Sequence, residues 1–563
     1  MNLFKKSLIV IALTVALTLI FGSCGGDEHC SHRDKDDDSL CDLCGVAYQD
    51  GNESSGNNTS GGNSGESSNN NTSGGGFTGG NGSSENSSNS DDYSDDGVVY
   101  LISTDGTYAE VVDYTGSSKM VRIAESYEGV PVTSVGTAAF ANKEITSVII
   151  PDSVTSIACG AFSWCNSLTS ITLPFIGANE LSNNAHHLGY IFGDTGIFVS
   201  NSEVPTSLET VIITKTSSIG DYAFRGCRRI KNIVIPDSVS IIGRDAFEDC
   251  DNLIEEESGV FYVGKWVVGF DDSTAIVSVR EGTVGIAEES FSYTEKLRSL
   301  ALPDSITYIC DNALLECSGL QYNLYNNGYY LGNGNNPYLA LVKLKDNTIS
   351  EFSIYANAKF ILSSAFSGCI NLTSIAIPNS ITSISASAFS GCTNLTSISI
   401  PDGISSIGWR TFYGCTNLTS ITLPDSVTSI GGDAFYGCTN LTSITLPDSI
   451  TSIGDRAFYY CSSLASITIP NSVISIGDSA FRWCGSLMSV TIGDSVTRIG
   501  TWAFSSCSNL ASIIIPISVN RIGSRAFQWC DSLTIKIEAE SMPLDWASDW
   551  NFTGCPVVWG YIE

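Results

Sequence analysis

The sequence predicts a repeat solenoid, mainly β-structure with short helical or 3₁₀ turns, because one phrase of 23 residues recurs along it. From residue 366 onward the phrase, roughly NLTSITIPDSVTSIGDxAFxGCT, is written eight times in succession. Looser copies precede it, so that about 14 coils are expected in all. A solenoid offers a long repetitive surface rather than a deep polar cleft, which favours binding over catalysis.

Each unit is expected to contain two short extended stretches and one turn. In residues 395–415, Ile398 and Ile400 lie two apart with serine between them, which predicts a strand with one buried face. Pro401 has no N–H for a ladder and ends this strand. The turn that carries Phe412 is too short for more than one helical or 3₁₀ turn. Stacking is expected to place equivalent apolar residues on one another: Ile398, Ile421, Ile444, Ile467, Val490 and Ile513.

Three insertions interrupt the earlier copies, at residues 175–216, 255–289 and 320–362. Insertions in a solenoid usually emerge on one face, so the aromatic-rich segments within them are expected to form β-hairpins or arms that stand off the array. After Leu533 the spacing shortens, and the tryptophan-rich remainder is interpreted as a cap that covers the last coil.

The first residues have the layout of a secretory signal peptide. Lys5 and Lys6 precede an apolar run from residue 8 to residue 21, which is too short for a confident membrane span. Gly22-Ser23-Cys24 follows and resembles a bacterial lipobox, which predicts cleavage before Cys24 and a diacylglycerol on its sulfur. Simple secretion with cleavage nearby is the alternative. In either case the mature chain is not expected to span a membrane.

A small cluster of possible metal ligands follows. Cys30, His32, Cys41 and Cys44 could close a tetrahedral Zn²⁺ site, because two thiolates in a C-x-x-C turn suit one metal. The alternatives are a Cys41–Cys44 or Cys30–Cys44 disulfide and a segment without order. A calcium loop is a weaker match, because glycine and glutamate are missing at the required positions. Any metal here would be structural, and no other cofactor is expected.

The domain organisation expected from these features has six parts. They are a lipoprotein signal peptide (1–23), a lipid-anchored Cys/His/Asp-rich knot (24–45), a disordered Gly/Ser/Asn tether (46–97), irregular repeats with insertions (98–365), regular 23-residue repeats (366–533) and a C-terminal cap (534–563).

Two groups of aromatic residues are candidates for ligand binding. Tyr413, Tyr436 and Tyr459 recur at the repeat period and are flanked by Tyr460, Trp483 and Trp529. Packing against neighbouring coils is an equally good interpretation of this stripe. The second group lies in the insertions: Trp266, Tyr325, Tyr329 and Tyr330. Large aromatic side chains are favoured anchors at interfaces, whereas the Thr/Ser face of the strands repeats with too little variation to encode specificity.

Other chemistries find little support. The cysteines at every 23rd residue are interpreted as small buried hydrophobic residues, because identical thiols provide no separate nucleophile and resolving partner. His186 and His187 lie near no serine or cysteine motif. The net charge of −32 argues against nucleic acid as a partner. No acid–base or nucleophile constellation is present, so the chain is not expected to be an enzyme.

Several phrases resemble the BspA-like leucine-rich repeat surface proteins. They are LTSITLPDSVTSIGGDAFYGCTN, YEGVPVTSVGTAAF, HLGYIF with VPTSLETVIIT, and WNFTGCPVVWGY. The resemblance covers residues 98–563 and implies a right-handed leucine-rich-repeat superhelix at a bacterial cell surface. Some members are implicated in adhesion to host matrix proteins or in coaggregation.

The expected function is therefore non-enzymatic binding or adhesion by a lipid-anchored solenoid at the cell surface or outer envelope. Its partner would be a protein or glycan ligand on a host or neighbouring bacterial surface, and the lipid would provide the contact with the membrane. A surface glycan-capture or structural envelope lipoprotein is the alternative.

Overall fold

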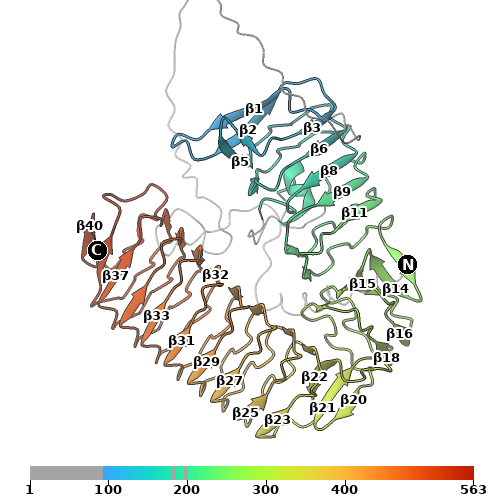
Figure 1. The fold of residues 1–563 in the computed structure, drawn as a ribbon, viewed down its shortest axis with the longest axis vertical. Helices are drawn as coiled ribbons and strands as arrows, with labels where there is room; N and C mark the ends of the chain where they lie inside the picture. Colours follow the sequence, from blue (N-terminus) through green and yellow to red (C-terminus); the bar gives the residue numbers. More distant parts are fainter. Residues whose placement is uncertain (1–92, 180–185, 196–200, 563) are drawn as a thin grey trace, which may run out of the picture. The chain divides into compact units, whose positions relative to one another are not determined.

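A computed structural model describes residues 93–179, 186–195 and 201–562. Residues Asn89–Glu563 form one compact unit. As expected, this unit is a β-solenoid, whose parallel coils stack side by side (Figure 1). The predicted signal peptide, the predicted metal-ligand cluster and nearly all of the predicted tether lie outside the described residues.

One ladder of strands is built from the L-x-x-I-x-I part of each unit, and Figure 1 shows many of its members side by side. Isoleucine or another apolar residue points into the core from the middle of most of these strands, while its two neighbours face solvent. The members are β3 (Met120–Arg122), β6 (Ser147–Ile149), β8 (Ser170–Leu173), β9 (Thr210–Ile213), β11 (Asn232–Val234), β16 (Ile276–Ser278), β18 (Ser299–Ala301), β23 (Glu351–Ser353), β25 (Ser374–Ala376), β27 (Ser397–Ser399), β29 (Ser420–Thr422), β31 (Ser443–Thr445), β33 (Ser466–Thr468), β35 (Ser489–Thr491), β37 (Ser512–Ile515), β39 (Thr534–Ile537) and β40 (Val557–Trp559).

A second ladder follows the turn after the strand proline. Its strands are mostly two residues long because a glycine or another turn residue ends them at once. The members are β5 (Val130–Val135), β7 (Ser156–Ile157), β10 (Ser218–Ile219), β12 (Ile241–Ile242), β17 (Gly285–Ile286), β19 (Tyr308–Ile309), β24 (Phe360–Ile361), β26 (Ser383–Ile384), β28 (Ser406–Ile407), β30 (Ser429–Ile430), β32 (Ser452–Ile453), β34 (Ser475–Ile476), β36 (Arg498–Ile499) and β38 (Arg521–Ile522).

The register expected from the repeat is confirmed. Ile398 pairs with Ile421 and Ile421 with Ile444, in parallel and one period apart. At the C-terminal end Ile513 pairs with Ile535, so the last regular step is one residue shorter, as the spacing after Leu533 predicts. The segment interpreted as a cap continues the ladder, because β40 pairs with β39 in parallel.

The interpretation of the insertions as arms standing off the array is wrong. Residues 255–289 do form a hairpin, from β13 (Glu255–Glu257), β14 (Val260–Val263) and β15 (Trp266–Phe270), but β15 then pairs in parallel with β17 of the solenoid. The next insertion repeats this arrangement with β20 (Asn323–Tyr325), β21 (Gly328–Leu331) and β22 (Ala340–Leu344), and β22 pairs with β24. Each hairpin thus takes the place of part of a coil, which buries its alternating apolar face.

The first insertion also supplies a coil that the repeat phrase does not reveal. Its turn is the 3₁₀ helix η1 (Leu188–Phe192), and the Phe162 N–H donates to the Ile191 carbonyl at 2.9 Å. Regular coils make the same contact, for example from the Phe435 N–H to the Ala457 carbonyl at 2.8 Å. The number of coils therefore differs slightly from the expected 14.

At the N-terminal end, β1 (Val98–Ile102) and β2 (Ala109–Tyr114) form an antiparallel pair. β2 then joins β5 in parallel, and β4 (Ser126–Tyr127) pairs with the start of β5. This sheet begins the stack.

A column of phenylalanine rings fills the core. In the regular coils successive rings stack nearly parallel, with centroids 5.4 Å apart for Phe412 and Phe435 and 5.2 Å apart for Phe435 and Phe458. Where a hairpin replaces a coil, the hairpin insertion still supplies a ring, since Phe270 packs on Phe291 and Phe352 on Phe366. The ring of each hairpin insertion thus extends the column of the coils that follow it.

Candidate ligand-binding surface

The turn of each coil is not helical, apart from η1 among the described residues. In the regular coils the turn has two residues in the left-handed conformation four positions apart, for example Asp433 at φ 54° and Gly437 at φ 70°. A left-handed residue every four positions cannot continue a right-handed helix. This corrects the expectation of short helical turns, and it fixes which side chains the turn presents.

The type of residue at the second left-handed position of the turn changes along the stack. Glycine occupies it in four successive coils, at Gly368, Gly391, Gly414 and Gly437. Tyr460, Trp483, Ser506 and Trp529 then follow at the same register, with φ between 60° and 66°. A bulky residue in this conformation costs about 1–2 kcal/mol relative to glycine.

The aromatic residues at this position are only partly buried. Tyr460, Trp483 and Trp529 keep 49%, 43% and 48% of their surface exposed. A Cβ atom built at Gly437 would meet no atom closer than 3.9 Å, so crowding next to the backbone does not explain why this position is glycine. Left-handed non-glycine residues occur in nearly every turn, so the feature that marks this column as a candidate for binding is its large, partly exposed aromatic side chains.

The neighbouring tyrosine stripe is a stack. The rings of Tyr413, Tyr436 and Tyr459 lie 4.7 Å apart with interplanar angles of 12° and 3°. All three are half-buried. Burial, followed by the neighbouring Tyr413 and Tyr459, raises the pKa of the Tyr436 hydroxyl. Because the ring faces cover one another, a ligand can reach mainly their edges and hydroxyl groups.

Charged residues hold the N-terminal end of this stripe. The Arg410 guanidinium lies 5.1 Å from the ring centre of Tyr413 and 4.1 Å from that of Trp409. The buried Asp433 carboxylate pairs with Arg410 at 3.1 Å and with Arg456 at 3.2 Å. These contacts join three coils, so the stripe has a fixed geometry.

The aromatic candidates in the insertions divide into two classes. Trp266 is 3% exposed and Tyr330 is fully buried, so these two predicted ligand-binding residues are core residues of the hairpins. Tyr325 is 36% exposed and packs against Tyr330, Tyr338 and Tyr355. Tyr329 is half-buried beside Tyr322. Sequence reasoning missed the buried pair because a hairpin that joins the stack has the same alternating pattern as one that leaves it.

The strand face carries the expected rows of hydroxyl groups. Ser420 and Thr422 are exposed on β29, and Ser443 and Thr445 are exposed on β31. Thr419, next to the strand, donates its hydroxyl to the Thr396 carbonyl of the preceding coil at 3.1 Å. Part of this hydroxyl array therefore serves the stack itself.

The regular cysteines are buried, as the sequence predicts, and they have an additional role. From Cys392 to Cys530 each thiol donates to the carbonyl of the phenylalanine one coil back, as Cys438 does to Phe412 at 3.2 Å and Cys461 to Phe435 at 3.2 Å. Burial raises the pKa of Cys438 to about 12. A thiol in such a site is a poor nucleophile.

The predicted lipid and zinc residues, Cys24, Cys30, His32, Cys41 and Cys44, lie outside the described part of the chain. Within residues 93–179, 186–195 and 201–562, no three His, Cys, Asp or Glu side chains gather in a group suited to a metal. His187 is described and buried, and burial lowers its pKa. Over the same residues no helix is long and apolar enough to cross a membrane.

A family model described as "BspA type Leucine rich repeat region (6 copies)" matches residues 133–187, 203–321, 344–464 and 428–555, which is more than half of the chain. The chain belongs to the BspA-type leucine-rich repeat family. No curated protein matches it.

Solved structures of leucine-rich repeat proteins are similar to it. One from Bacteroides ovatus is 25% identical, with a TM-score of 0.34, over 83% of this chain and 99% of that chain. The T. pallidum leucine-rich repeat protein is 27% identical, with a TM-score of 0.31, over 34% of this chain and 90% of that chain. A leucine-rich cell surface protein from Faecalibacterium prausnitzii is 24% identical, with a TM-score of 0.23, over 82% and 96%.

Proposed function

We propose that this BspA-type protein is a non-enzymatic binding or adhesion module that holds a protein ligand on its aromatic turn surface. This surface is defined by six residues of the regular coils: Tyr413, Tyr436, Tyr459, Tyr460, Trp483 and Trp529. The observation that carries the proposal is the replacement of glycine by exposed Tyr460, Trp483 and Trp529 at a left-handed position. Glycine would avoid the backbone strain there.

The chemistry of the surface suits a protein partner. Tyrosine and tryptophan supply most of the binding energy at many protein interfaces, because they bury a large area with few rotatable bonds. The tyrosine stack offers a row of hydroxyl groups and ring edges rather than open ring faces. A glycan that stacks on the exposed indole rings is the alternative, and the experiment below distinguishes the two.

We propose a location at the cell surface or outer envelope, with the chain anchored through a lipid on Cys24. The support is the signal-peptide layout that ends at Gly22-Ser23-Cys24. One similar structure is also described as a cell surface protein. A lipid anchor followed by a polar tether would hold the solenoid away from the membrane.

The test uses a substitution that is expected to preserve the fold. The purified protein is screened against panels of matrix proteins, bacterial surface proteins and glycans, and then compared with the triple variant Tyr460→Gly, Trp483→Gly and Trp529→Gly. Glycine occupies the same position in earlier coils, so this variant should keep the turn conformation and the fold. We expect it to lose binding by about 100-fold.

The matched control places charge on the strand face with Thr422→Lys and Thr445→Lys, which should bind normally. If the lysine pair abolishes binding while the glycine variant binds like the wild type, the strand face is the site and the proposal is wrong. A ligand found only on the glycan panel and lost in the glycine variant would favour the glycan alternative.

A further inference from the structure

The hydrogen-bond ladder along the turns is broken where the second hairpin enters the stack. In regular coils three turn N–H groups donate to the next coil, and the last two of them are those of Phe412, which donates to Ala434 at 2.8 Å, and of Gly414, which donates to Tyr436 at 2.7 Å. The equivalent donors in the coil before this hairpin are Leu314 and Glu316. Their N–H groups have no partner among the described residues.

The opposite side of the break lacks partners too. By the same register the acceptors for Leu314 and Glu316 would be the carbonyls of Ala365 and Ser367, which accept no hydrogen bond from the described residues. The thiol ladder is interrupted at the same place, because no bond joins the buried Cys369 to the Leu314 carbonyl. The neighbouring coils are complete, since the Phe366 N–H donates to Ala388 at 2.8 Å.

The reason for the break is that the hairpin supplies a strand and the insertion a core ring, but no turn. β22 pairs with β24, and Phe352 packs on Phe366, yet nothing stands in the turn ladder between Leu314 and Ala365. The first hairpin has the same effect, because the N–H groups of Phe247 and Asp249 also lack partners in the described part of the chain. The gap between Leu314 and Ala365, called the second break below, therefore follows from the architecture of the hairpin insertions.

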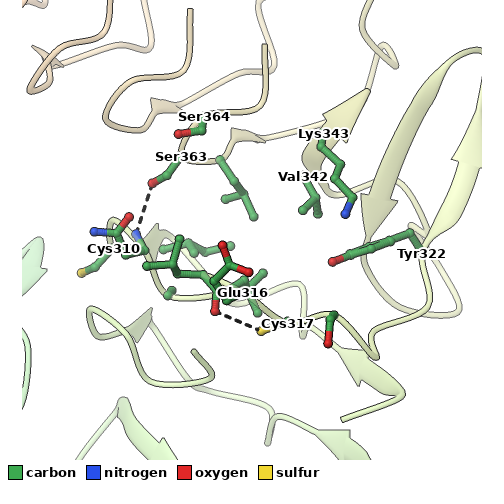
Figure 2. A pocket seen from close by; sticks show the side chains of 15 residues that line it. Cys310, Glu316, Cys317, Tyr322, Val342, Lys343, Ser363 and Ser364 are labelled. Carbon is green, nitrogen blue, oxygen red and sulfur yellow. Dashed lines mark hydrogen bonds between the residues drawn. The ribbon is translucent and has the colours of Figure 1, made fainter. Parts of the chain in front are cut away.

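A cavity of about 360 Å³ lies at the second break, where its lining includes the donor residues Leu314 and Glu316 and reaches Ser364, next to Ala365 (Figure 2). Figure 2 shows Ser363 and Ser364 on one side, Glu316 and Cys317 on the other, and Val342, Lys343 and Tyr322 at one end. Its apolar lining includes Ile309, Ala313, Leu315, Val342 and Leu362.

One end of the break is closed by side chains. The Asn312 N–H donates to the Ser363 hydroxyl at 3.2 Å, and this hydroxyl bonds the Asp311 carboxylate at 3.2 Å. Asp311 in turn accepts from the Ala386 N–H at 2.7 Å. The two coils are thus held together beside Asn312, and the free donors and acceptors follow directly after this closed end.

We propose that the second break binds a short peptide segment of a partner protein, which takes the place of the missing turn. Two peptide carbonyls would accept from Leu314 and Glu316, and two peptide N–H groups would donate to Ala365 and Ser367. A polypeptide backbone carries alternating donors and acceptors of this kind, which is the basis of peptide binding by strand addition. An apolar side chain between small residues, as in the A-F-x-G of the regular turns, fits the apolar lining.

This site is independent of the aromatic turn surface, so either proposal can fail without the other. The probe is the synthetic peptide acetyl-GDAFYGST-amide, which has the sequence of residues 432–439 with Cys438→Ser. A scrambled peptide of the same composition is the control probe. Binding to the purified protein is measured by fluorescence anisotropy and located by amide hydrogen exchange.

In the free protein we expect the amides of Leu314 and Glu316 to exchange faster than those of Phe412 and Gly414, which are bonded in the ladder. The peptide, but not its scrambled form, should slow exchange at Leu314 and Glu316 about tenfold or more. Val342→Trp places a large side chain at the end of the cavity and should abolish binding. Lys345→Ala removes an exposed charge directly after the same strand, outside the cavity lining, and should leave binding within about threefold.

Three results would overturn the proposal. The break is closed if, in the free protein, the amides of Leu314 and Glu316 are as well protected from exchange as those of Phe412 and Gly414. Binding without added protection at these two amides would place the peptide elsewhere. Equal or absent binding of the two peptides up to millimolar concentration would show that the break does not select a turn-like segment, and this result does not depend on the folding of any variant.

Discussion

Removal of the Phe435 ring tests whether the stack is held by its ring column. Phe435 is fully buried, with ring centres 5.4 Å away in Phe412 and 5.2 Å away in Phe458. Phe435→Ala removes roughly 100 Å² of buried apolar surface, worth about 2.5 kcal/mol at 25 cal/mol per Å². Two ring contacts add about 0.5–1.5 kcal/mol each, so the expected loss is about 4 kcal/mol, within the range for buried aromatic residues.

The loss should be local, because each coil contacts only its neighbours. Amide hydrogen exchange should therefore accelerate in the coils that carry Phe412, Phe435 and Phe458, while β39 keeps its protection. Tyr436→Ala is the matched control, since the next residue along the chain is only half-buried and should affect exchange much less. Unchanged exchange in Phe435→Ala, or an equal effect from both variants, would refute the role of the column.

Four further outcomes are expected. Cys438 should resist maleimide in the native protein at pH 8 and react in urea, because burial raises its pKa to about 12; native labelling would contradict this. Burial and then repulsion from Asp221 raise the pKa of Glu288 from 4.5 to about 7, so the contribution of Glu288 to stability is full below pH 4.5 and is lost as pH rises through 7. Glu288→Gln should therefore flatten the melting temperature between these pH values. An unchanged pH profile in this variant would contradict the role of Glu288. Metabolic labelling with a fatty-acid analogue should mark the wild type and spare Cys24→Ala, whereas equal labelling would exclude the lipid site. A peptide of residues 25–50 should bind about one Zn²⁺ that is lost in Cys44→Ser, and a metal-free peptide with a disulfide would favour the alternative.

The aromatic turn surface was only partly visible in the sequence. The period of 23 residues places Tyr413, Tyr436 and Tyr459 in one stripe, but it does not show that their rings stack face to face. It also places Tyr460 and Trp483 in register with Gly437, and this glycine-to-aromatic exchange is the signal that could have identified the left-handed position. Backbone conformation at a turn depends on hydrogen bonds to both neighbouring coils, which no single unit contains.

The sequence by itself determined the solenoid, the strand register and the core positions of each regular coil. It could do so because neighbouring coils are nearly identical, so that Ile398 must meet Ile421 whatever the exact shape of the turn. Only the tertiary structure decided the place of the insertions. Their strands have no identical neighbour, and whether β15 and β22 join the stack depends on pairing with distant coils. The same non-repeating contacts buried Trp266 and Tyr330 and left the turn ladder open at Leu314.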